Sequence, residues 1–520
     1  MHGIAFFFFI VSITQVYTRD VDFCFADEDD PYLYMGTKTA YHFVHAGKTR
    51  FQTVPNCQPV QVWMLATHGT RCPSPAEITE MLTLTDLQSQ ILHNHETRDG
   101  HMCNRDLENL RRWQPDAYLA MNRAEVLTPQ GVEDMRLLAR RLQSNFPQLL
   151  QPADASITSE NYKFKTTDAR DSMESFIEGL FGSRTAVTPE ETSVNDTLLT
   201  AYKTCEDWTT GQNDSFEEVR KFDEGPQFQN LLQNVSRRIG FLYNISEKSI
   251  LTMYDMCRYE KAWTVTKLSP WCAVFSKEEL RILEYREDLY YYYKAGYGRA
   301  INAQLGCTLL QDMMSHFRDV EENGNSTAPR GVFYFSDVIS LQNLLTSLNI
   351  NRDQMQMAAY NYKDMARRQW RTSFISSIAA NLVAVFYRCD SGSNSNKVMF
   401  YLAEKPVLFD GCNVGLCDWD YLKNKFGRIV THCNLDVCWN GSGVTSSFVP
   451  NFILVLLALF SLVFNWFNEL LIAFRTLMWL SAMFPYVCIC IGKLLLFCIG
   501  SKSYLINNSN LTTILSKFES

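Results

Sequence analysis

The fold of this chain is decided by one stretch, Trp63-Met64-Leu65-Ala66-Thr67-His68-Gly69-Thr70-Arg71-Cys72-Pro73. The apolar run from Val60 to Ala66 is rich in β-forming residues, which predicts a buried strand. The glycine and the proline that follow indicate a loop. Because ligands of open α/β sheets gather at the carboxyl ends of strands, we expect a binding site directly after this strand.

Two side chains of the loop suit phosphoryl chemistry. The neutral imidazole of His68 can attack phosphorus as a covalent nucleophile. The planar guanidinium of Arg71 can hold two phosphoryl oxygens and spread their charge. Gly69, between them, would let the backbone approach a phosphate closely. The alternative is a turn with a solvated arginine and a packed histidine, and the stretch alone does not separate the two interpretations.

The composition limits the classes of function. A chain of 520 residues can bury a large core in more than one domain, and a net charge of −8 argues against a nucleic-acid partner. Sixteen cysteines suit an oxidising compartment. The apolar block Ala5–Ile13 within residues 1–18 indicates a secretory signal. Eight N-x-S/T sequons agree with secretion: Asn195, Asn213, Asn234, Asn244, Asn325, Asn440, Asn507 and Asn510.

The order of the expected elements indicates an α/β protein with an insertion. Thr128 and Pro129 favour the start of an amphipathic helix that packs on the sheet, and Ser172–Phe181 has the same character. Gly331–Ser336 is a second buried run. Residues 185–250 are polar, with little strand pattern, and indicate an inserted cap. Further strands are expected at Ala379–Tyr387 and Lys397–Leu402, and a further helix at Leu341–Leu348.

The loop resembles the R-H-G-x-R-x-P signature of the histidine acid phosphatases, which implies a phosphohistidine at His68. Seven stretches resemble one branch of that family, the multiple inositol polyphosphate phosphatases, in the same order: Gly36–Tyr41, Val60–Ser74, Leu127–Pro147, Tyr162–Gly182, Tyr254–Gly298, Gly331–Leu348 and Tyr387–Phe426. The resemblance implies an α/β histidine phosphatase fold, with a mixed central sheet flanked by helices and a helical cap over the site. It implies no metal or organic cofactor.

The phosphate-binding residues only partly follow the family. The first arginine of the signature is Thr67 here, and Lys38 is the cation of the matching loop 34–41. A third arginine of the family precedes the Ser172–Phe181 helix. An ungapped alignment places Asp168 at that position, whereas a small loop deletion would bring in Arg170, and both alternatives remain open. The candidate substrate-binding residues are therefore Arg71, Arg170, Thr67 and Lys38.

At the position of the family's proton donor, this chain departs further from the family. The donor is the glutamate of an H-A-E triplet after the second buried strand, and this chain has Asp337, Val338 and Ile339 there. Asp337 is a carboxylic acid near the right place and is the candidate acid beside His68. Its shorter reach and its offset from Ile339 argue against full efficiency. Glu404 lies in a later strand, where the family has an ordinary pair, and we do not assign it to the site.

Three functions remain open on these residues. The first is a phosphomonoester hydrolase of the inositol polyphosphate type with weakened activity. Loss of a charge partner in the transition state costs roughly 100- to 1000-fold in rate, and loss of the general acid roughly 100- to 10,000-fold. The second is a pseudophosphatase that binds a phosphorylated ligand or a protein partner without turnover. The third is a structural surface glycoprotein. The implied ligand is a small molecule of the inositol polyphosphate or bisphosphoglycerate type.

The histidines and cysteines do not indicate a metal site. His93, His95, Glu96, His101 and Cys103 match no standard zinc spacing, and a solvated stretch next to a helix explains them. Cys412 and Cys417, and further on Cys433 and Cys438, suit disulfides better than metal ligation. The family resemblance implies that Cys257 pairs with Cys272.

The domain organisation follows from these segments. We expect a signal peptide at 1–18, the first part of the α/β domain at 19–160, a helical cap at 161–318, the second part of the α/β domain at 319–445, a hydrophobic membrane tail at 446–500 and a polar end at 501–520. The runs Phe448–Phe467 and Thr476–Gly492 are long and apolar enough for one or two transmembrane helices, and a lipid-anchor signal is the alternative. The expected location is the cell surface or the endoplasmic reticulum lumen, with the chain attached to a membrane.

Overall fold

The computed structural model describes residues 24–25, 31–45, 54–97, 99–193, 195–323, 328–390 and 395–439, and two short segments at 488–490 and 496–498. Residues up to Gly441 belong to one compact unit, and residues 442–520 to a second. The predicted signal peptide and the apolar run Phe448–Phe467 lie outside the described residues.

A mixed sheet forms the centre of the first unit, as predicted. Its strands are β1 (Cys57–Thr67), β2 (Tyr162–Thr166), β3 (Gly331–Ser336), β4 (Asn381–Cys389), β5 (Asn396–Leu402), β6 (Lys405–Pro406) and β7 (Leu416–Asp418). The order is β2-β3-β1-β4-β5-β6, with β7 also paired to β5. Strands β1, β2 and β3 are parallel, whereas β4 and β5 run antiparallel to their neighbours. Thr67 pairs with Ser336, so β1 and β3 end side by side.

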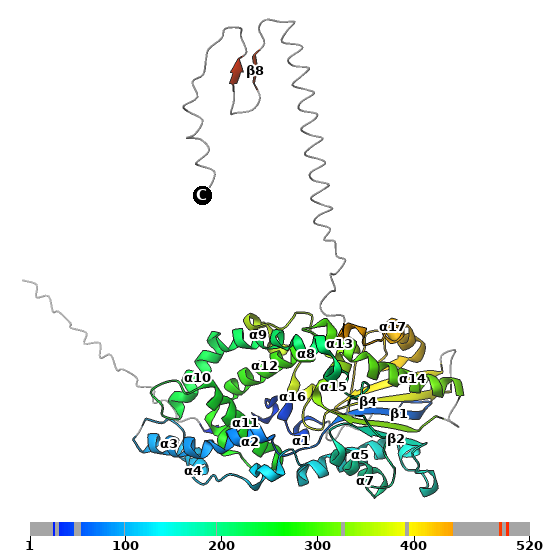
Figure 1. Ribbon diagram of the computed structural model, residues 1–520, viewed down its shortest axis with the longest axis horizontal. Coiled ribbons are helices and arrows are strands. Elements are labelled where there is room, and N and C mark those ends of the chain that lie inside the picture. The colour runs from blue at the N-terminus through cyan, green and yellow to red at the C-terminus, as the bar shows by residue number, and fades with distance from the viewer. Residues whose placement is uncertain are drawn as a thin grey trace, which may run out of the picture. The chain divides into compact units, whose positions relative to one another are not determined.

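The sheet is buried on both faces, because its strands carry apolar side chains that alternate between two cores. Trp63 and Leu65 of β1 belong to one core, and Val62, Met64 and Ala66 belong to the other. Helices α5 and α7 cover the second face, and helices α14 and α15 lie on the first (Figure 1).

The helices are α1 (Tyr41–Val44), α2 (Pro75–Leu82), α3 (Leu84–Glu96), α4 (Asn104–Arg111), α5 (Pro129–Asn145), α6 (Pro147–Leu150), α7 (Arg170–Phe181), α8 (Glu206–Thr210), α9 (Gln212–Asp223), α10 (Pro226–Arg238), α11 (Glu247–Trp263), α12 (Lys277–Lys294), α13 (Ala300–Leu305), α14 (Cys307–Asn323), α15 (Val338–Ser347), α16 (Thr372–Ile375) and α17 (Trp419–Thr431). Thr128 caps α5 as predicted, since its side chain accepts a hydrogen bond from Gly131 N. Helix α15 begins at Val338, before the Leu341 expected from the sequence, because Asp337 caps its first turn.

Helices α9–α12 gather beside the sheet, together with α2–α4 from the first third of the chain (Figure 1). The sequence places the start of the cap at residue 161, but β2 pairs with β3 inside the central sheet and α7 packs against that sheet. The alternating burial of Tyr162, Phe164 and Thr166 explains the difference, because this period-two pattern belongs to a sheet strand.

Within the described residues, six disulfides join segments that are mostly far apart in the sequence: Cys24–Cys103, Cys57–Cys389, Cys205–Cys438, Cys257–Cys272, Cys307–Cys433 and Cys412–Cys417. The pairing of Cys257 with Cys272 is confirmed. Cys412 pairs with Cys417 five residues away, whereas Cys433 and Cys438 reach back 126 and 233 residues. The segment that follows α17 is thus fastened to α14 and to the cap.

In the second unit the structure describes only β8 (Cys488–Cys490) and β9 (Leu496–Cys498), which pair antiparallel. Cys488–Cys490 lies inside the run Thr476–Gly492, for which the sequence predicts a transmembrane helix, and these three residues are strand instead. The reason is their pairing: each lies opposite a residue of β9. Among the described residues, no helix has the length and apolar character needed to cross a membrane.

Candidate active site

His68 follows the last residue of β1, at the carboxyl edge of the sheet. Its carbonyl accepts a hydrogen bond from Ala379 N at 3.0 Å, and its Nδ1 lies 2.9 Å from Gly69 O. A carbonyl oxygen only accepts hydrogen bonds, so Nδ1 carries the proton and Nε2 carries a lone pair, which has no partner in the described part of the chain. Burial, with the nearby charge of Arg71, lowers the pKa of His68 to about 3. The imidazole is therefore neutral, which is the form that can act as a nucleophile.

The loop after His68 is packed against the start of α5. Thr70 Oγ1 donates to Asp134 Oδ2 at 2.7 Å, and Thr70 O accepts from Thr128 N at 2.9 Å. A Cβ on Gly69 would lie 2.6 Å from Gly131 O, so this close backbone approach requires glycine. The sequence assigns Gly69 to phosphate approach, and the structure gives it a second role in the contact with α5.

Two cations, Arg71 and Lys38, lie near enough to His68 for their charges to lower the pKa of its imidazole. The backbone carbonyl of Arg71 accepts a hydrogen bond from Trp263 Nε1 at 3.2 Å, which fixes this residue at the loop. Among the described residues, no carboxylate forms an ion pair with the Arg71 guanidinium. Arg71 is therefore available to an anionic ligand.

Lys38, in contrast, is already neutralised by protein groups. Its Nζ lies 3.1 Å from Glu77 Oε1 and 3.8 Å from Asp255 Oδ1, and 5.2 Å from the centre of the Tyr259 ring. A cavity of about 220 Å³ opens beside it, lined by Thr37, Asp255, Arg258, Glu287 and Tyr291 among others. A phosphorylated ligand would have to compete with these two carboxylates for Lys38.

Glu77 is a residue of this region that the sequence analysis did not single out. It forms a capping box with Ser74 at the start of α2 and accepts a hydrogen bond from the Tyr259 hydroxyl at 3.0 Å. Burial acts to raise its pKa, but Lys38 and the bonds from Ser74 outweigh burial and lower the pKa to about 2. The S-x-x-E spacing of Ser74 and Glu77 was the available signal, since it is typical of a capping box.

Asp337 does not have the geometry of a proton donor. Its Oδ1 accepts from Ser340 N at 3.0 Å as the cap of α15, and its Oδ2 accepts a hydrogen bond from the Tyr202 hydroxyl. Both carboxylate oxygens are therefore engaged as acceptors in structural contacts. Burial and Asp337 together raise the pKa of Tyr202 well above its usual value, so the phenol retains its proton.

The position of the family glutamate is apolar here. Ile339 packs against the small hydrophobic cluster around Tyr202, Trp208, Leu305 and Cys438. Its side chain therefore belongs to the contact between α15 and the cap, and it offers no proton.

In the described part of the chain, no contact links Arg170 to His68. It is the first residue of α7, its side chain is 71% exposed, and its ion pair is with Glu174 at 3.8 Å. Asp168 lies just before α7 and pairs with Lys203 of the cap, with 2.5 Å between Oδ2 and Nζ. The third cation in this region is thus a lysine from the cap, a residue that the sequence analysis missed.

Thr67 is 1% exposed, and its backbone N–H donates to Ala380 O at 2.8 Å. Its hydroxyl has no hydrogen-bond partner among the described residues. A buried hydroxyl without a partner costs about 1–3 kcal/mol, so a ligand oxygen that bonded it would regain part of that free energy.

Glu404 and His95 are occupied by structural contacts. Glu404 is 5% exposed, binds Arg141 through both carboxylate oxygens and accepts from the Tyr41 hydroxyl. His95 Nδ1 lies 2.8 Å from Ile91 O, and its Nε2 accepts from Met102 N at 3.2 Å. Glu404 is therefore held in place by these contacts and is not positioned as an acid of the site. His95 has no lone pair left for a metal.

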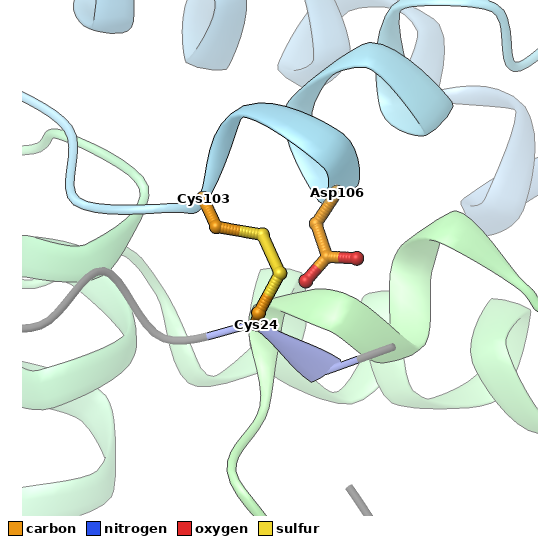
Figure 2. Close-up of side chains that lie close together, drawn as sticks. All are labelled: Cys24, Cys103 and Asp106. Carbon is orange, nitrogen blue, oxygen red and sulfur yellow. A yellow bond between two sulfur atoms is a disulfide. The ribbon is translucent and has the colours of Figure 1, made fainter. Parts of the chain in front are cut away.

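Cys24, Cys103 and Asp106 lie close together, in the arrangement of a possible metal site. Figure 2 shows the two sulfurs joined in a disulfide, with the Asp106 carboxylate beside them. Asp106 Oδ2 accepts a hydrogen bond from Phe25 N at 2.6 Å. The cluster therefore fastens the segment around Cys24 to α4, and it does not have a ligand set for a metal.

Residues 60–402 match the model of the histidine phosphatase superfamily, branch 2. The chain belongs to this family. It is 35% identical over 433 residues to multiple inositol polyphosphate phosphatase 1 of Drosophila melanogaster, with 81% of this chain and 91% of the relative covered. The human protein of the same name is 29% identical over 435 residues, with 77% and 87% covered. The resemblance to the multiple inositol polyphosphate phosphatases is confirmed.

Solved histidine phosphatase structures share the fold. The phytase from D. castellii superposes with a TM-score of 0.62 at 16% identity, covering 78% of this chain and 86% of the phytase. The multiple inositol polyphosphate phosphatase of Bifidobacterium longum, in complex with inositol hexasulfate, gives 0.56 at 12% identity, covering 75% and 96%. These likenesses confirm the predicted fold class.

Proposed function

We propose that the carboxyl edge of β1 binds a phosphorylated inositol and hydrolyses its phosphate esters slowly through a phosphohistidine at His68. The observation that carries this proposal is the state of His68. It is neutral, and within the described residues neither its Nε2 lone pair nor the nearby Arg71 guanidinium has a partner. The names of the relatives support an inositol polyphosphate as the substrate.

The reaction requires two displacements at phosphorus. Nε2 of His68 attacks the phosphorus, a P–N bond forms, and the ester P–O bond breaks with its electron pair on the departing alkoxide oxygen. Arg71 holds two equatorial oxygens, and the Thr67 hydroxyl donates to a third. Water then attacks the phosphohistidine, the P–N bond breaks, and His68 returns to its neutral form as phosphate leaves.

The weak point of this reaction is protonation of the alkoxide. Asp337 accepts hydrogen bonds at both oxygens, and Ile339 has no proton to give, so the proton has to come from water. A missing general acid and a missing arginine each cost about 100-fold or more. We therefore expect turnover at least about 100-fold slower than that of the Drosophila melanogaster relative.

These contacts also favour a second candidate function. If turnover is negligible, the same site acts as a pseudophosphatase that binds a phosphorylated ligand without hydrolysing it. The Tyr202–Asp337 hydrogen bond is the observation that favours it, because it commits Asp337, the candidate acid, to a structural contact. A purely structural role, without any ligand, would not explain why the Arg71 guanidinium has no ion-pair partner among the described residues.

One experiment separates the candidates. Phosphate release from inositol hexakisphosphate is measured for the purified full chain, its His68→Ala variant and the Drosophila melanogaster relative, and binding of the same ligand is measured by calorimetry. Slow release abolished by His68→Ala supports the weak hydrolase, and binding without release supports the pseudophosphatase. Release at the relative's rate would contradict the weakening, and absence of both would leave the structural glycoprotein.

The six disulfides indicate a secretory or lumenal protein. We further propose a cleaved signal at residues 1–18 and glycans at Asn195, Asn234 and Asn244, whose side chains are exposed. The membrane tail at 446–500 stays a prediction. Treatment of intact cells with a phosphatidylinositol-specific phospholipase tests it: release indicates a lipid anchor, retention indicates helices, and a protein that stays in the aqueous phase of a detergent partition has neither.

A further inference from the structure

A short segment of the cap is held over the carboxyl end of β3. It comprises Leu199 and the 3₁₀ helix Ala201–Thr204. The Ser336 and Ser340 hydroxyls both lie within hydrogen-bond distance of Leu199 O, at 3.0 and 2.5 Å. With the Tyr202–Asp337 hydrogen bond and the Cys205–Cys438 disulfide, these contacts fix the backbone of Lys203 at the edge of the sheet.

The ammonium of Lys203 is fixed less firmly than its backbone. Its only ion pair in the described part of the chain is with Asp168 Oδ2, at 2.5 Å, and the two side chains are 39% and 54% exposed. An exposed pair of this kind is worth little in stability, typically below about 1 kcal/mol in similar cases. A multivalent anion can therefore take the ammonium away from Asp168.

The sheet sets the spacing between the chain segments that carry Asp168 and His68. Asp168 lies just beyond β2, and β3 separates β2 from β1. Neighbouring strands are about 4.8 Å apart, so the end of β2 is roughly 10 Å from the end of β1. A single phosphate at His68 does not bridge that distance, whereas a small ring with several phosphates does.

We propose that Lys203 binds a second phosphate group of a polyphosphorylated ligand whose first phosphate lies at His68. This inference rests on the proposed function and adds to it a residue that selects polyphosphates over monophosphates. Asp168 acts against the ligand in two ways: it occupies the ammonium, and it repels the incoming phosphate. The cap thus supplies a cation next to Asp168, just beyond the carboxyl end of β2.

Replacing each partner of the ion pair in turn tests the proposal, because the two variants should change the ligand affinity in opposite directions. Lys203→Met and Asp168→Asn break the same ion pair, so a purely structural pair predicts the same effect for both variants. The proposal predicts opposite effects on the affinity for inositol hexakisphosphate: roughly 3- to 10-fold weaker for Lys203→Met and roughly 3- to 10-fold stronger for Asp168→Asn. Calorimetry is carried out in the full chain with His68→Ala, which prevents turnover.

A matched control pair is available on the same strand. Lys163 and Glu190 form an exposed ion pair at 3.6 Å, and Lys163 lies at the beginning of β2, away from the carboxyl edge. Lys163→Met and Glu190→Gln should leave the affinity for inositol hexakisphosphate unchanged. Inorganic phosphate, which fills one position only, should bind all the variants alike.

Each other outcome overturns the proposal. Equal changes for Lys203→Met and Asp168→Asn would make the ion pair structural, and no change would place Lys203 outside the site. Changed binding of inorganic phosphate would place Lys203 at the first phosphate. If the parent binds inositol hexakisphosphate in these cases, the proposed function survives. If the parent binds none, both proposals fail.

Discussion

The Tyr202 hydroxyl donates a hydrogen bond to Asp337 Oδ2, so a residue of the cap is fastened to the residue that caps α15. The second carboxylate oxygen accepts from Ser340 N. Asp337 is thus shared between two elements at the edge of the sheet. It is the residue that the sequence analysis assigned to proton donation, and its contacts are those of a structural anion.

Asp337→Ala and Asp337→Asn should therefore affect stability more than catalysis. We expect Asp337→Ala to lower the free energy of unfolding by about 1–2 kcal/mol, because it removes the cap of α15 and leaves Tyr202 without its acceptor. Asp337→Asn keeps an oxygen for the cap and should lose less. Urea unfolding and phosphate release are measured on the same samples. A loss of phosphate release in Asp337→Asn at unchanged stability would show that the carboxyl is the acid after all.

The neutral state of His68 depends first on its burial and then on the charge of Arg71. Since burial and the Arg71 charge lower the pKa of His68 to about 3, its ring should not titrate between pH 5 and 8. Arg71→Met removes one of these causes, so the pKa should rise towards the ordinary value of about 6.5. NMR of the ring nitrogens, assigned by the signal lost in His68→Ala, measures both proteins. A midpoint near 6.5 in the parent protein would contradict the tautomer and the burial inferred here.

The loop and α5 should tolerate no side chain at their contact. A Cβ on Gly131 would lie 2.1 Å from Thr70 O, and one on Gly69 would lie 2.6 Å from Gly131 O. Because these obstacles are backbone atoms, we expect Gly131→Ala and Gly69→Ala each to cost about 1–3 kcal/mol. Gly427 in α17 is the matched control, with nothing within 4 Å of its Cβ position. Gly427→Ala should gain about 0.5–1 kcal/mol. Thermal unfolding that ranked all three alike would refute the close packing.

Glu260 should make the stability of the protein depend on pH. Burial raises its pKa to about 7, although the hydrogen bonds from Ser269 and Trp113 oppose that rise. Between pH 4.5 and 7 the folded state keeps a proton that the unfolded chain has lost, so stability falls as pH rises through this window. Glu260→Gln has no such proton. Its unfolding free energy, relative to the parent, should therefore improve by about 1–3 kcal/mol from pH 5 to pH 8.

The control for this measurement is Glu224→Gln, which removes one negative charge from a side chain that is 67% exposed. Its difference from the parent should stay constant over the same pH range. A constant difference for Glu260→Gln as well would mean that Glu260 is ionised in the folded protein throughout.

What could be predicted from the sequence was local. The apolar run before His68 and the glycine and proline after Arg71 are adjacent in the chain, and they determine a strand and its loop directly. The cap of α5 by Thr128 is equally local. Each of these predictions agrees with the structure because no distant residue was needed to make it.

What could not be predicted depended on distant partners. Tyr202 lies 135 residues from Asp337, and Lys203 lies 35 residues from Asp168, so no spacing rule connects them. Arg170 looked like a phosphate ligand by its position in the sequence, but the first turn of α7 directs it to Glu174. Cys433 and Cys438 are neighbours in the sequence, and only the packing of α17 gives each its own distant partner.

The Cys57–Cys389 disulfide encloses most of the chain between its ends, since 332 residues separate its sulfurs. Any single cut by a protease between these two cysteines leaves both pieces covalently joined, and β1 stays clamped to β4. A nicked molecule would run as a single band on a gel without reductant and separate into fragments once the thiols were reduced. In a secretory or lumenal protein, the strand before the His68 loop would thus stay joined to β4 even after the backbone had been cut elsewhere.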